Sequence, residues 1–175
     1  FGGINLEDIS APRCFEIETR LNEMLDIPVF HDDQHGTAIV VLAGIINGLR
    51  VTGKKKEDCK VVVNGAGSAG VAITKLLLTY GFKDVTMCDR LGIIGPDYPD
   101  LNWMQKEMTK VTNLSHAAGT LADALKGADI FVGVSAPNIV SPEMVSSMNS
   151  DAILFAMANP VHEIMPDVAR AAGAR

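Results

Sequence analysis

Three glycines, Gly65, Gly67 and Gly70, follow a run of three valines in the spacing G-x-G-x-x-G. In a strand–turn–helix unit, the first glycine makes the tight turn, the second lets the backbone approach a pyrophosphate, and the third allows close helix–strand packing. The helix that follows directs its free N–H groups and the positive end of its dipole at the phosphates. The predicted dinucleotide contacts in this turn are Gly65, Gly67, Ser68, Ala69 and Gly70.

An acid stands where a ribose-binding residue is expected. Asp89 ends a second apolar segment and follows Gly70 by 19 residues, the distance at which an acid binds the ribose hydroxyls of NAD. A 2′-phosphate, as in NADP, would meet the carboxylate charge, although the neighbouring Arg90 could pair with that phosphate. We therefore expect NAD, with NADP as a second candidate. The alternative is an α/β domain whose glycine turn serves packing alone.

Two further segments combine small and polar residues after apolar runs. Ser135 and Ala136 follow residues 128–134, and Asn159 follows residues 152–157. Ligands gather at the carboxyl ends of strands in an open α/β sheet, so these residues are candidates for the loops beneath a nicotinamide ring and its substrate. The alternative is ordinary turn formation, because Ser-Ala-Pro and Asn-Pro also make good turns.

Carboxylates near the beginning of the chain form a third candidate group. Glu7, Asp8 and Asp33 would suit a hard divalent cation such as Mg²⁺ or Mn²⁺, which prefers oxygen ligands. Spacing alone does not bring Asp33 close to the pair, so exposed acids at the ends of elements are the other interpretation. His31 and His35 flank this region, but imidazole prefers softer ions, and we expect each either to contact the metal ligands from behind or to have a structural role.

The elements that must position these residues alternate between strand and helix. Apolar residues at three- and four-residue spacing predict an amphipathic helix over 12–25. The segment 36–49 is apolar nearly all round, so we expect a helix that is covered on most sides, either within the domain or at a subunit contact. Asp100 is expected to cap a helix that runs toward residue 111, and Thr120 begins a capping box. The βαβ alternation predicts an α/β fold of the Rossmann type, with a doubly wound, mostly parallel sheet.

Composition bounds the possible partners and compartments. The 175 residues carry a formal charge of −6, which argues against a nucleic-acid partner, and no apolar run reaches the roughly 18 residues of a membrane span. Cys14, Cys59 and Cys88 lack the spacing of a zinc site or a disulfide framework, so reduced thiols in a cytoplasmic protein are expected. The chain begins without methionine or a signal-peptide pattern, and we expect it to be part of a longer protein.

Together these segments resemble malic enzymes, most closely the short bacterial and archaeal form. The resemblance spans essentially the whole chain, and DDQHGT is far more specific than the glycine motif. The matching segments are INLEDI (4–9), VFHDDQHGTA (29–38), VNGAGSAG (63–70), GVSAP (133–137) and FAMANP (155–160). The resemblance implies that residues 1–31 are the edge of a substrate and metal domain, and that residues 32–175 are an NAD(P)-binding domain.

The resemblance also implies roles for individual residues. Glu7, Asp8 and Asp33 would bind the cation, and Asn159 would contact malate. The implied reaction is oxidation of malate at C2 by hydride transfer to the nicotinamide, loss of CO₂, and protonation of the resulting enolate to pyruvate. A homodimer or higher homo-oligomer is expected as well.

The proton-transfer residues of this family have no counterpart in the chain. The family's tyrosine acid and lysine base are expected upstream of Phe1, so no catalytic acid or base is assigned here and the chain alone is expected to be inactive. Two alternatives remain open. One is another NAD-dependent dehydrogenase, of the amino-acid or methylenetetrahydrofolate type, and the other is a non-catalytic nucleotide-sensing module.

Overall fold

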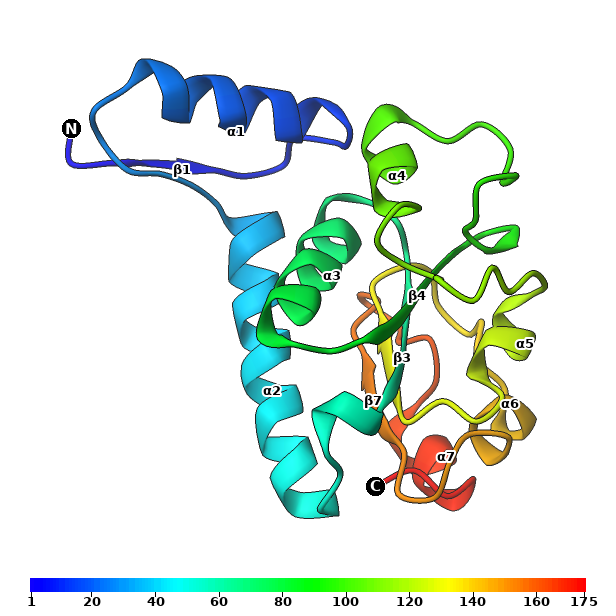
Figure 1. The fold of residues 1–175 in the computed structure, drawn as a ribbon. Coiled ribbons are helices and arrows are strands. Elements are labelled where there is room, and N and C mark those ends of the chain that lie inside the picture. Colours follow the sequence, from blue (N-terminus) through cyan, green and yellow to red (C-terminus); the bar gives the residue numbers. More distant parts are fainter.

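The computed structural model describes residues 1–175, which form a small two-stranded sheet and a separate five-stranded sheet (Figure 1). The small sheet pairs β1 (Ile4–Leu6) with β2 (Val29–His31) in parallel. Helix α1 (Arg13–Met24) connects these two strands, as the amphipathic pattern predicted. The predicted domain boundary after residue 31 coincides with the end of β2 but stays a prediction.

The larger sheet has the strand order β5-β4-β3-β6-β7. Four of its strands are parallel, and the short edge strand β5 pairs antiparallel with β4. The strands are β3 (Lys60–Asn64), β4 (Asp84–Asp89), β5 (Gly92–Ile93), β6 (Ile130–Gly133) and β7 (Ile153–Ala156). This arrangement confirms the predicted α/β class with a mostly parallel sheet.

Helices cover both faces of the five-stranded sheet (Figure 1). Val61 and Val63 pack in a core cluster with residues of α2 and α3, whereas Val62 packs on the other side with residues of α5, α6 and α7. Both faces of the parallel strands are therefore buried, which explains their continuous apolar sequences. The helices are α2 (Thr37–Thr52), α3 (Ser68–Tyr80), α4 (Trp103–Met108), α5 (Leu121–Leu125), α6 (Pro142–Ser146) and α7 (Pro166–Ala171).

Two helix boundaries differ from the sequence prediction. Helix α4 is capped by Asn102, which forms a capping box with Gln105, and the predicted cap Asp100 instead has a positive φ of 55°. Helix α2 is preceded by a π-helical turn, Asp32–Gly36, that continues into it. The continuous helix Asp32–Thr52 has 21 residues and is long and apolar enough to cross a membrane by length and composition alone, a test that core helices of soluble proteins also pass.

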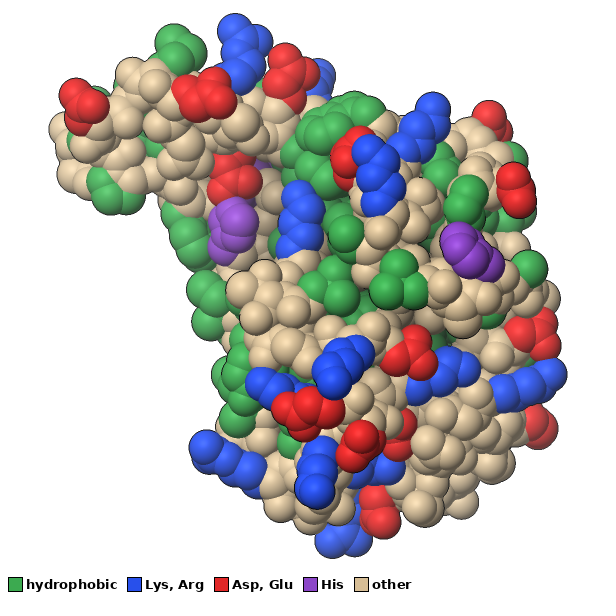
Figure 2. All heavy atoms as spheres, viewed as in Figure 1, with side chains coloured by type: hydrophobic (Ala, Val, Ile, Leu, Met, Phe, Trp, Pro, Cys, Tyr) green, Lys and Arg blue, Asp and Glu red, His purple; other side chains and the backbone are tan.

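The sequence placed the helix of residues 36–49 within the domain or at a subunit contact, and within this chain α2 is covered on one side only. Val41 and Ile45 lie in the core, but Ile39, Val40 and Val51 are 55%, 70% and 67% exposed. Hydrophobic side chains accordingly gather along the outer edge of the molecule at α2 (Figure 2). The reason is geometric: α2 packs on α3 and β7 with one side only, and no other element of the chain reaches its outer face.

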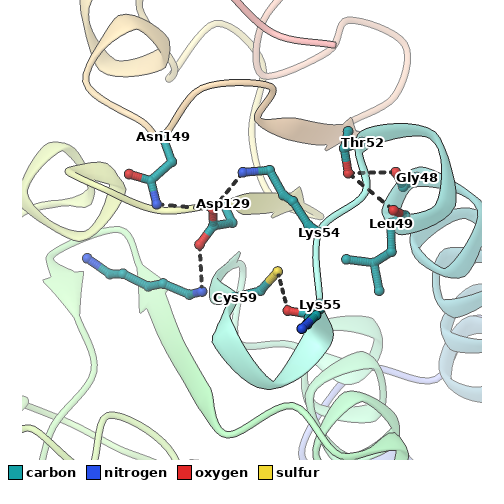
Figure 3. A network of polar contacts seen from close by, with 9 residues as sticks. Gly48, Leu49, Thr52, Lys54, Lys55, Cys59, Asp129 and Asn149 are labelled. Carbon is teal, nitrogen blue, oxygen red and sulfur yellow. Dashed lines mark hydrogen bonds and ion pairs between the residues drawn. The ribbon is translucent and has the colours of Figure 1, made fainter.

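A buried carboxylate fixes the amino end of the sheet (Figure 3). Asp129, directly before β6, accepts hydrogen bonds from Lys54 Nζ at 2.8 Å, from the Lys60 N–H at 3.0 Å and from Asn149 Nδ2 at 3.0 Å. Burial opposes its ionisation, but these donors outweigh that effect and lower the pKa of Asp129. The network ties the beginnings of β3 and β6 to the loop before β7.

Candidate functional site

The main cleft opens where the chain reverses its direction across the sheet. After β3 the chain proceeds to β4 on one side, and it later returns to place β6 on the other side of β3. Loops that diverge at such a switch point leave a crevice beyond the carboxyl ends of the strands. The main cleft, of about 750 Å³, is lined there by Asn64, Gly65, Ala66, Gly67, Asp89, Arg90, Val134, Ser135 and Ala136, with further residues from α4 and α5.

The three glycines of the motif have different steric surroundings. Gly65 has a φ of +113°, and a Cβ on it would lie 2.5 Å from the carbonyl oxygen of Val134. A Cβ on Gly70 would collide with the carbonyl oxygen of Gly65. A Cβ on Gly67, in contrast, would meet no atom within 4 Å. Gly65 and Gly70 therefore serve the tight turn and the close packing. Gly67 leaves open space through which a ligand could approach the protein backbone.

Helix α3 begins beside this open space. Its N-cap is Gly67, whose lack of a side chain leaves the first turn without a side-chain cap. Uncapped N–H groups and the helix dipole favour an anion at this point. Gly70 lines neither the main cleft nor the neighbouring hollow described below, so this predicted cofactor contact acts through packing instead.

Asp89 and Arg90 lie together at the end of β4. Oδ1 of Asp89 accepts a hydrogen bond of 2.8 Å from the Arg90 N–H, and both residues line the main cleft. The Arg90 side chain is exposed and forms no salt bridge. Asp89 and Arg90, which the sequence assigned to one site, both line the main cleft.

A second, more open hollow adjoins the main cleft. The side hollow, of about 730 Å³, shares Val134 and Ser135 with the main cleft and is also lined by Asp8, Ile9, Ser10, Asp33, Thr37, Ser68, Ala69, Met157, Ala158 and Asn159. Ser135 is held between the two, because its Oγ accepts a 2.7 Å hydrogen bond from Nδ2 of Asn64. The predicted residues Ser68, Ala69 and Asn159 therefore face the side hollow, and Ala136 faces the main cleft.

Tertiary structure brings two of the three predicted metal ligands together. Strands β1 and β2 pair in parallel with Leu6 opposite His31, so the acids that follow each strand emerge at the same end of the small sheet. The N–H of Asp8 donates a 2.9 Å hydrogen bond to Oδ2 of Asp33, and both residues line the side hollow. Glu7 does not join them: no three His, Cys, Asp or Glu side chains are arranged to hold a metal ion.

The donor chemistry at this place still fits a hard cation. Asp8 and Asp33 present carboxylate oxygens, and Glu7 is an exposed neighbour of Asp8 whose side chain is free to turn. Oxygen ligands of this kind suit Mg²⁺ or Mn²⁺. The metal site therefore stays a prediction: Asp8 and Asp33 lie together, and Glu7 does not converge with them on one point.

The two histidines next to these acids have different surroundings. His31 is fully buried, and neither ring nitrogen has a hydrogen-bond partner; its Nδ1 lies 4.0 Å from Oδ2 of Asp33. His35 pairs with Glu18 of α1 through Nε2, and Nε2 of Gln34 donates to the same carboxylate at 3.1 Å. The π-helical turn is thus anchored to α1, so His35 has the structural role that the sequence suggested.

Cys88 lies beside the main cleft but is chemically quiet. Burial raises the pKa of its thiol to about 12, and burial also raises the pKa of Cys59 to about 11. All three cysteines are free and buried, which agrees with the prediction of reduced thiols. A thiol that remains protonated at neutral pH is neither a nucleophile nor a metal ligand.

Sequence reasoning missed two residues that shape the site. Gln105 of α4 donates from Nε2 to the carbonyl oxygen of Ala66 at 3.1 Å and so supports the glycine turn. Glu163 is fully buried and binds the loops after β6 and β7. The only signal for Glu163 was an acid within the mostly apolar stretch that follows Asn159.

Comparisons with known proteins agree with this geometry. Residues 34–171 match the family model described as "Malic enzyme, NAD binding domain". The chain is 56% identical over 169 residues to an NAD-dependent malic enzyme of Geobacillus stearothermophilus, covering 97% of this chain and 35% of that protein. It is 49% identical to an NADP-dependent malic enzyme of Rhizobium meliloti, covering 95% of this chain and 22% of that protein.

A solved structure shows the same architecture. The NAD-dependent malic enzyme of Thermotoga maritima superimposes with a TM-score of 0.96 at 53% sequence identity, covering 99% of this chain and 47% of that chain. The chain therefore spans less than half the length of these relatives. Its glycine turn, Asp89 and the loop after β6 line one cleft in a doubly wound sheet, and the family model covers most of the chain. The chain belongs to the malic enzyme NAD-binding domain family.

Proposed function

We propose that this chain is the cofactor-binding portion of a malate dehydrogenase (oxaloacetate-decarboxylating), a malic enzyme that converts malate and NAD(P)⁺ to pyruvate, CO₂ and NAD(P)H. The observation that carries the proposal is the junction of the main cleft and the side hollow at Ser135. A dinucleotide in the main cleft would have its reactive end at this junction. A small acid in the side hollow would then lie next to it, between the carboxylates and Asn159.

The dinucleotide supplies the hydride acceptor, and this chain supplies the residues that bind the dinucleotide. Gly67 leaves room for the pyrophosphate at the beginning of α3, and Asp89 accepts hydrogen bonds from a ribose at the other end of the cleft. We propose a preference for NAD, because a 2′-phosphate would face the Asp89 carboxylate. Arg90 is free to pair with such a phosphate, so NADP is the second candidate.

A divalent cation, Mg²⁺ or Mn²⁺, supplies Lewis-acid polarisation of the substrate's oxygens when bound. We propose Glu7, Asp8 and Asp33 as its ligands. Support comes from the Asp8–Asp33 hydrogen bond at the rim of the side hollow and from the preference of these ions for carboxylate oxygens. Asn159, on the same hollow, is proposed to bind malate, since its amide can both donate to a carboxylate and accept from a hydroxyl.

The proposed context is a longer, cytoplasmic enzyme that forms a homodimer or a higher homo-oligomer. Its general acid and base would come from outside this chain, because no tyrosine and no lysine of the chain lines the side hollow. The exposed apolar face of α2 supports a further contact with another domain or subunit. No nucleic-acid partner is proposed, since the net charge is −6, and no membrane partner is proposed, since α2 places Val41 and Ile45 in the protein core.

The experiment compares the full-length protein with residues 1–175 in two assays. Calorimetric titration with NAD should show binding to both, because the main cleft is complete within the chain. Steady-state reduction of NAD with malate and Mn²⁺ should occur only in the full-length protein, because proton-transfer groups contribute about 10²–10⁴-fold each. A full-length protein that binds NAD but reduces it with an amino acid, and not with malate, would contradict the proposal.

A further inference from the structure

Glu163 is a buried carboxylate at the carboxyl end of the sheet and belongs to none of the predicted cofactor, metal or substrate groups. Its side chain is 0% exposed, and it forms no salt bridge. An unpaired charge in the interior is costly unless hydrogen-bond donors surround it. The hydrogen-bond donors around Glu163 therefore indicate which parts of the structure the carboxylate holds in place.

All of those donors come from the two loops that carry the proposed reaction site. Oε1 accepts hydrogen bonds from the N–H of Ser135 at 3.0 Å and from its hydroxyl at 3.2 Å. Oε2 accepts one from the N–H of Ala158 at 3.0 Å. Ser135 follows β6, and Ala158 follows β7 and directly precedes Asn159. One carboxylate therefore sets the position of the main cleft relative to Asn159.

The surrounding backbone is built to accommodate this side chain. A Cβ on Gly133, the last residue of β6, would collide with the Glu163 carboxyl group. The carbonyl oxygen of Glu163 accepts a 3.0 Å hydrogen bond from the Val140 N–H, and that of His162 accepts one of 3.0 Å from the Asn138 N–H. The backbone of Glu163 is thus held by hydrogen bonds, and the missing Cβ of Gly133 leaves room for its carboxyl group. Both features fix the position of the carboxylate.

We infer that Glu163 is a positioning residue for the substrate side of the site: it holds Ala158, and through it Asn159, in register with Ser135. The inference rests on the proposed function, because it assumes that Asn159 binds the substrate acid. Glu163 lies outside the residues that line the side hollow. It acts on the substrate through the backbone of its neighbours.

The substitution Glu163→Gln should keep the hydrogen bonds to Ser135 and remove the one to Ala158. The amide oxygen of glutamine can replace only one carboxylate oxygen, and it should remain on Ser135, where two donors converge. The amide NH₂ then faces the N–H of Ala158, so two donors oppose each other. The variant should therefore disturb the loop of Asn159 and leave the main cleft in place.

Asp129→Asn is the matched control. Asp129 lies directly before β6, whereas Glu163 contacts the loop that follows the end of β6. Asp129 is also buried, and one of its carboxylate oxygens accepts two hydrogen bonds while the other accepts one. Its network, seen in Figure 3, contacts neither the main cleft nor the side hollow. Both substitutions should lower the melting temperature, because each places a donor against a buried donor.

The test is made on the full-length protein with malate, Mn²⁺ and NAD. Glu163→Gln should raise the KM for malate tenfold or more, with kcat and the Kd for NAD within about threefold of wild type, whereas Asp129→Asn should keep the KM within about twofold. Equal changes in KM for the two variants, or an unchanged KM in Glu163→Gln, would overturn the inference. A wild-type protein that binds NAD but does not use malate would instead refute the proposed function.

A measurement on the wild-type protein covers the case in which Glu163→Gln does not fold. The Ala158 amide lies beyond the end of β7, and its hydrogen bond goes to Glu163. Its hydrogen exchange should be as slow as that of the strand amides and should slow further when malate is bound. Fast exchange at Ala158 would show that the carboxylate does not hold this loop.

Discussion

The N–H of Asp8 donates a 2.9 Å hydrogen bond to Oδ2 of Asp33, across 25 residues of sequence. The bond joins the segment after β1 to the π-helical turn after β2, and it forms at the rim of the side hollow. It orients one carboxylate oxygen of Asp33 through the backbone. The two acidic segments are therefore held side by side by the protein alone.

The first prediction concerns this pair. Asp33→Ala in the full-length protein should abolish Mn²⁺-dependent turnover of malate, because a hard cation would lose a carboxylate ligand. The Kd for NAD should stay within about threefold of wild type, since Asp33 does not line the main cleft. Asp26→Ala, which removes an exposed carboxylate before β2, is the control and should leave turnover unchanged. Turnover by Asp33→Ala at ordinary Mn²⁺ concentrations would remove Asp33 from the ligand set.

The second prediction separates two glycines of one motif. Gly70→Ala should destabilise the fold by about 1–3 kcal/mol, because the new Cβ collides with the Gly65 carbonyl oxygen. Gly67→Ala should leave the melting temperature nearly unchanged, because its Cβ meets no protein atom within 4 Å. It should nevertheless weaken NAD binding about tenfold, or about 1.4 kcal/mol. Thermal melts and calorimetry would report the two effects, and NAD binding by Gly67→Ala at wild-type strength would show that no ligand group comes close there.

The third prediction concerns the choice of dinucleotide. Asp89→Ala should weaken NAD binding by about 1.5–3 kcal/mol, the usual contribution of a hydrogen bond to a charged group. Its effect on NADP should be smaller or favourable, since the repulsion of a 2′-phosphate is removed. Arg90→Ala should weaken NADP more than NAD. Calorimetry with both dinucleotides decides the matter, and the idea fails if wild type binds NADP more tightly while Asp89→Ala retains full NAD affinity.

The fourth prediction follows from the buried thiol of Cys88. Its pKa is about 12 in the folded protein and about 8.5 in an unfolded chain. The raised folded pKa means that Cys88 contributes stability below pH 8.5, and that this contribution is lost as the pH rises toward 12. The melting temperature of wild type should therefore fall more steeply between pH 8.5 and 11 than that of Cys88→Ala. Parallel pH profiles for the two proteins would contradict the assignment.

The fifth prediction tests the outer face of α2. Ile39 and Val40 are 55% and 70% exposed on an apolar helix, so residues 1–175 alone should self-associate through this face. Val40→Lys should shift the chain toward monomer in sedimentation velocity, because a charge is costly to bury at such a contact. Val111→Lys, at a 47% exposed valine elsewhere, is the control and should have no effect. Association that survives Val40→Lys would place the contact on another surface.

The sequence by itself determined the parts of the site that depend on local sterics and periodicity. Gly65 and Gly70 of the motif stand where a Cβ would collide with backbone, and Asp89 lies at the end of the strand that the apolar run predicted. The class of fold followed from the same local patterns, since buried parallel strands need continuous apolar residues. The resemblance carried by DDQHGT and FAMANP added the family, which the comparisons confirm.

Tertiary structure alone decided which distant residues meet. Asp8 reaches Asp33 because β1 and β2 pair in register, and Glu163 reaches Ser135 because its segment folds back over the end of β6. The open face of α2 also follows from packing, since an apolar helix has the same sequence whether its outer face is covered or exposed. Contacts of this kind depend on loop paths and strand register, which apolar periodicity along the chain does not encode.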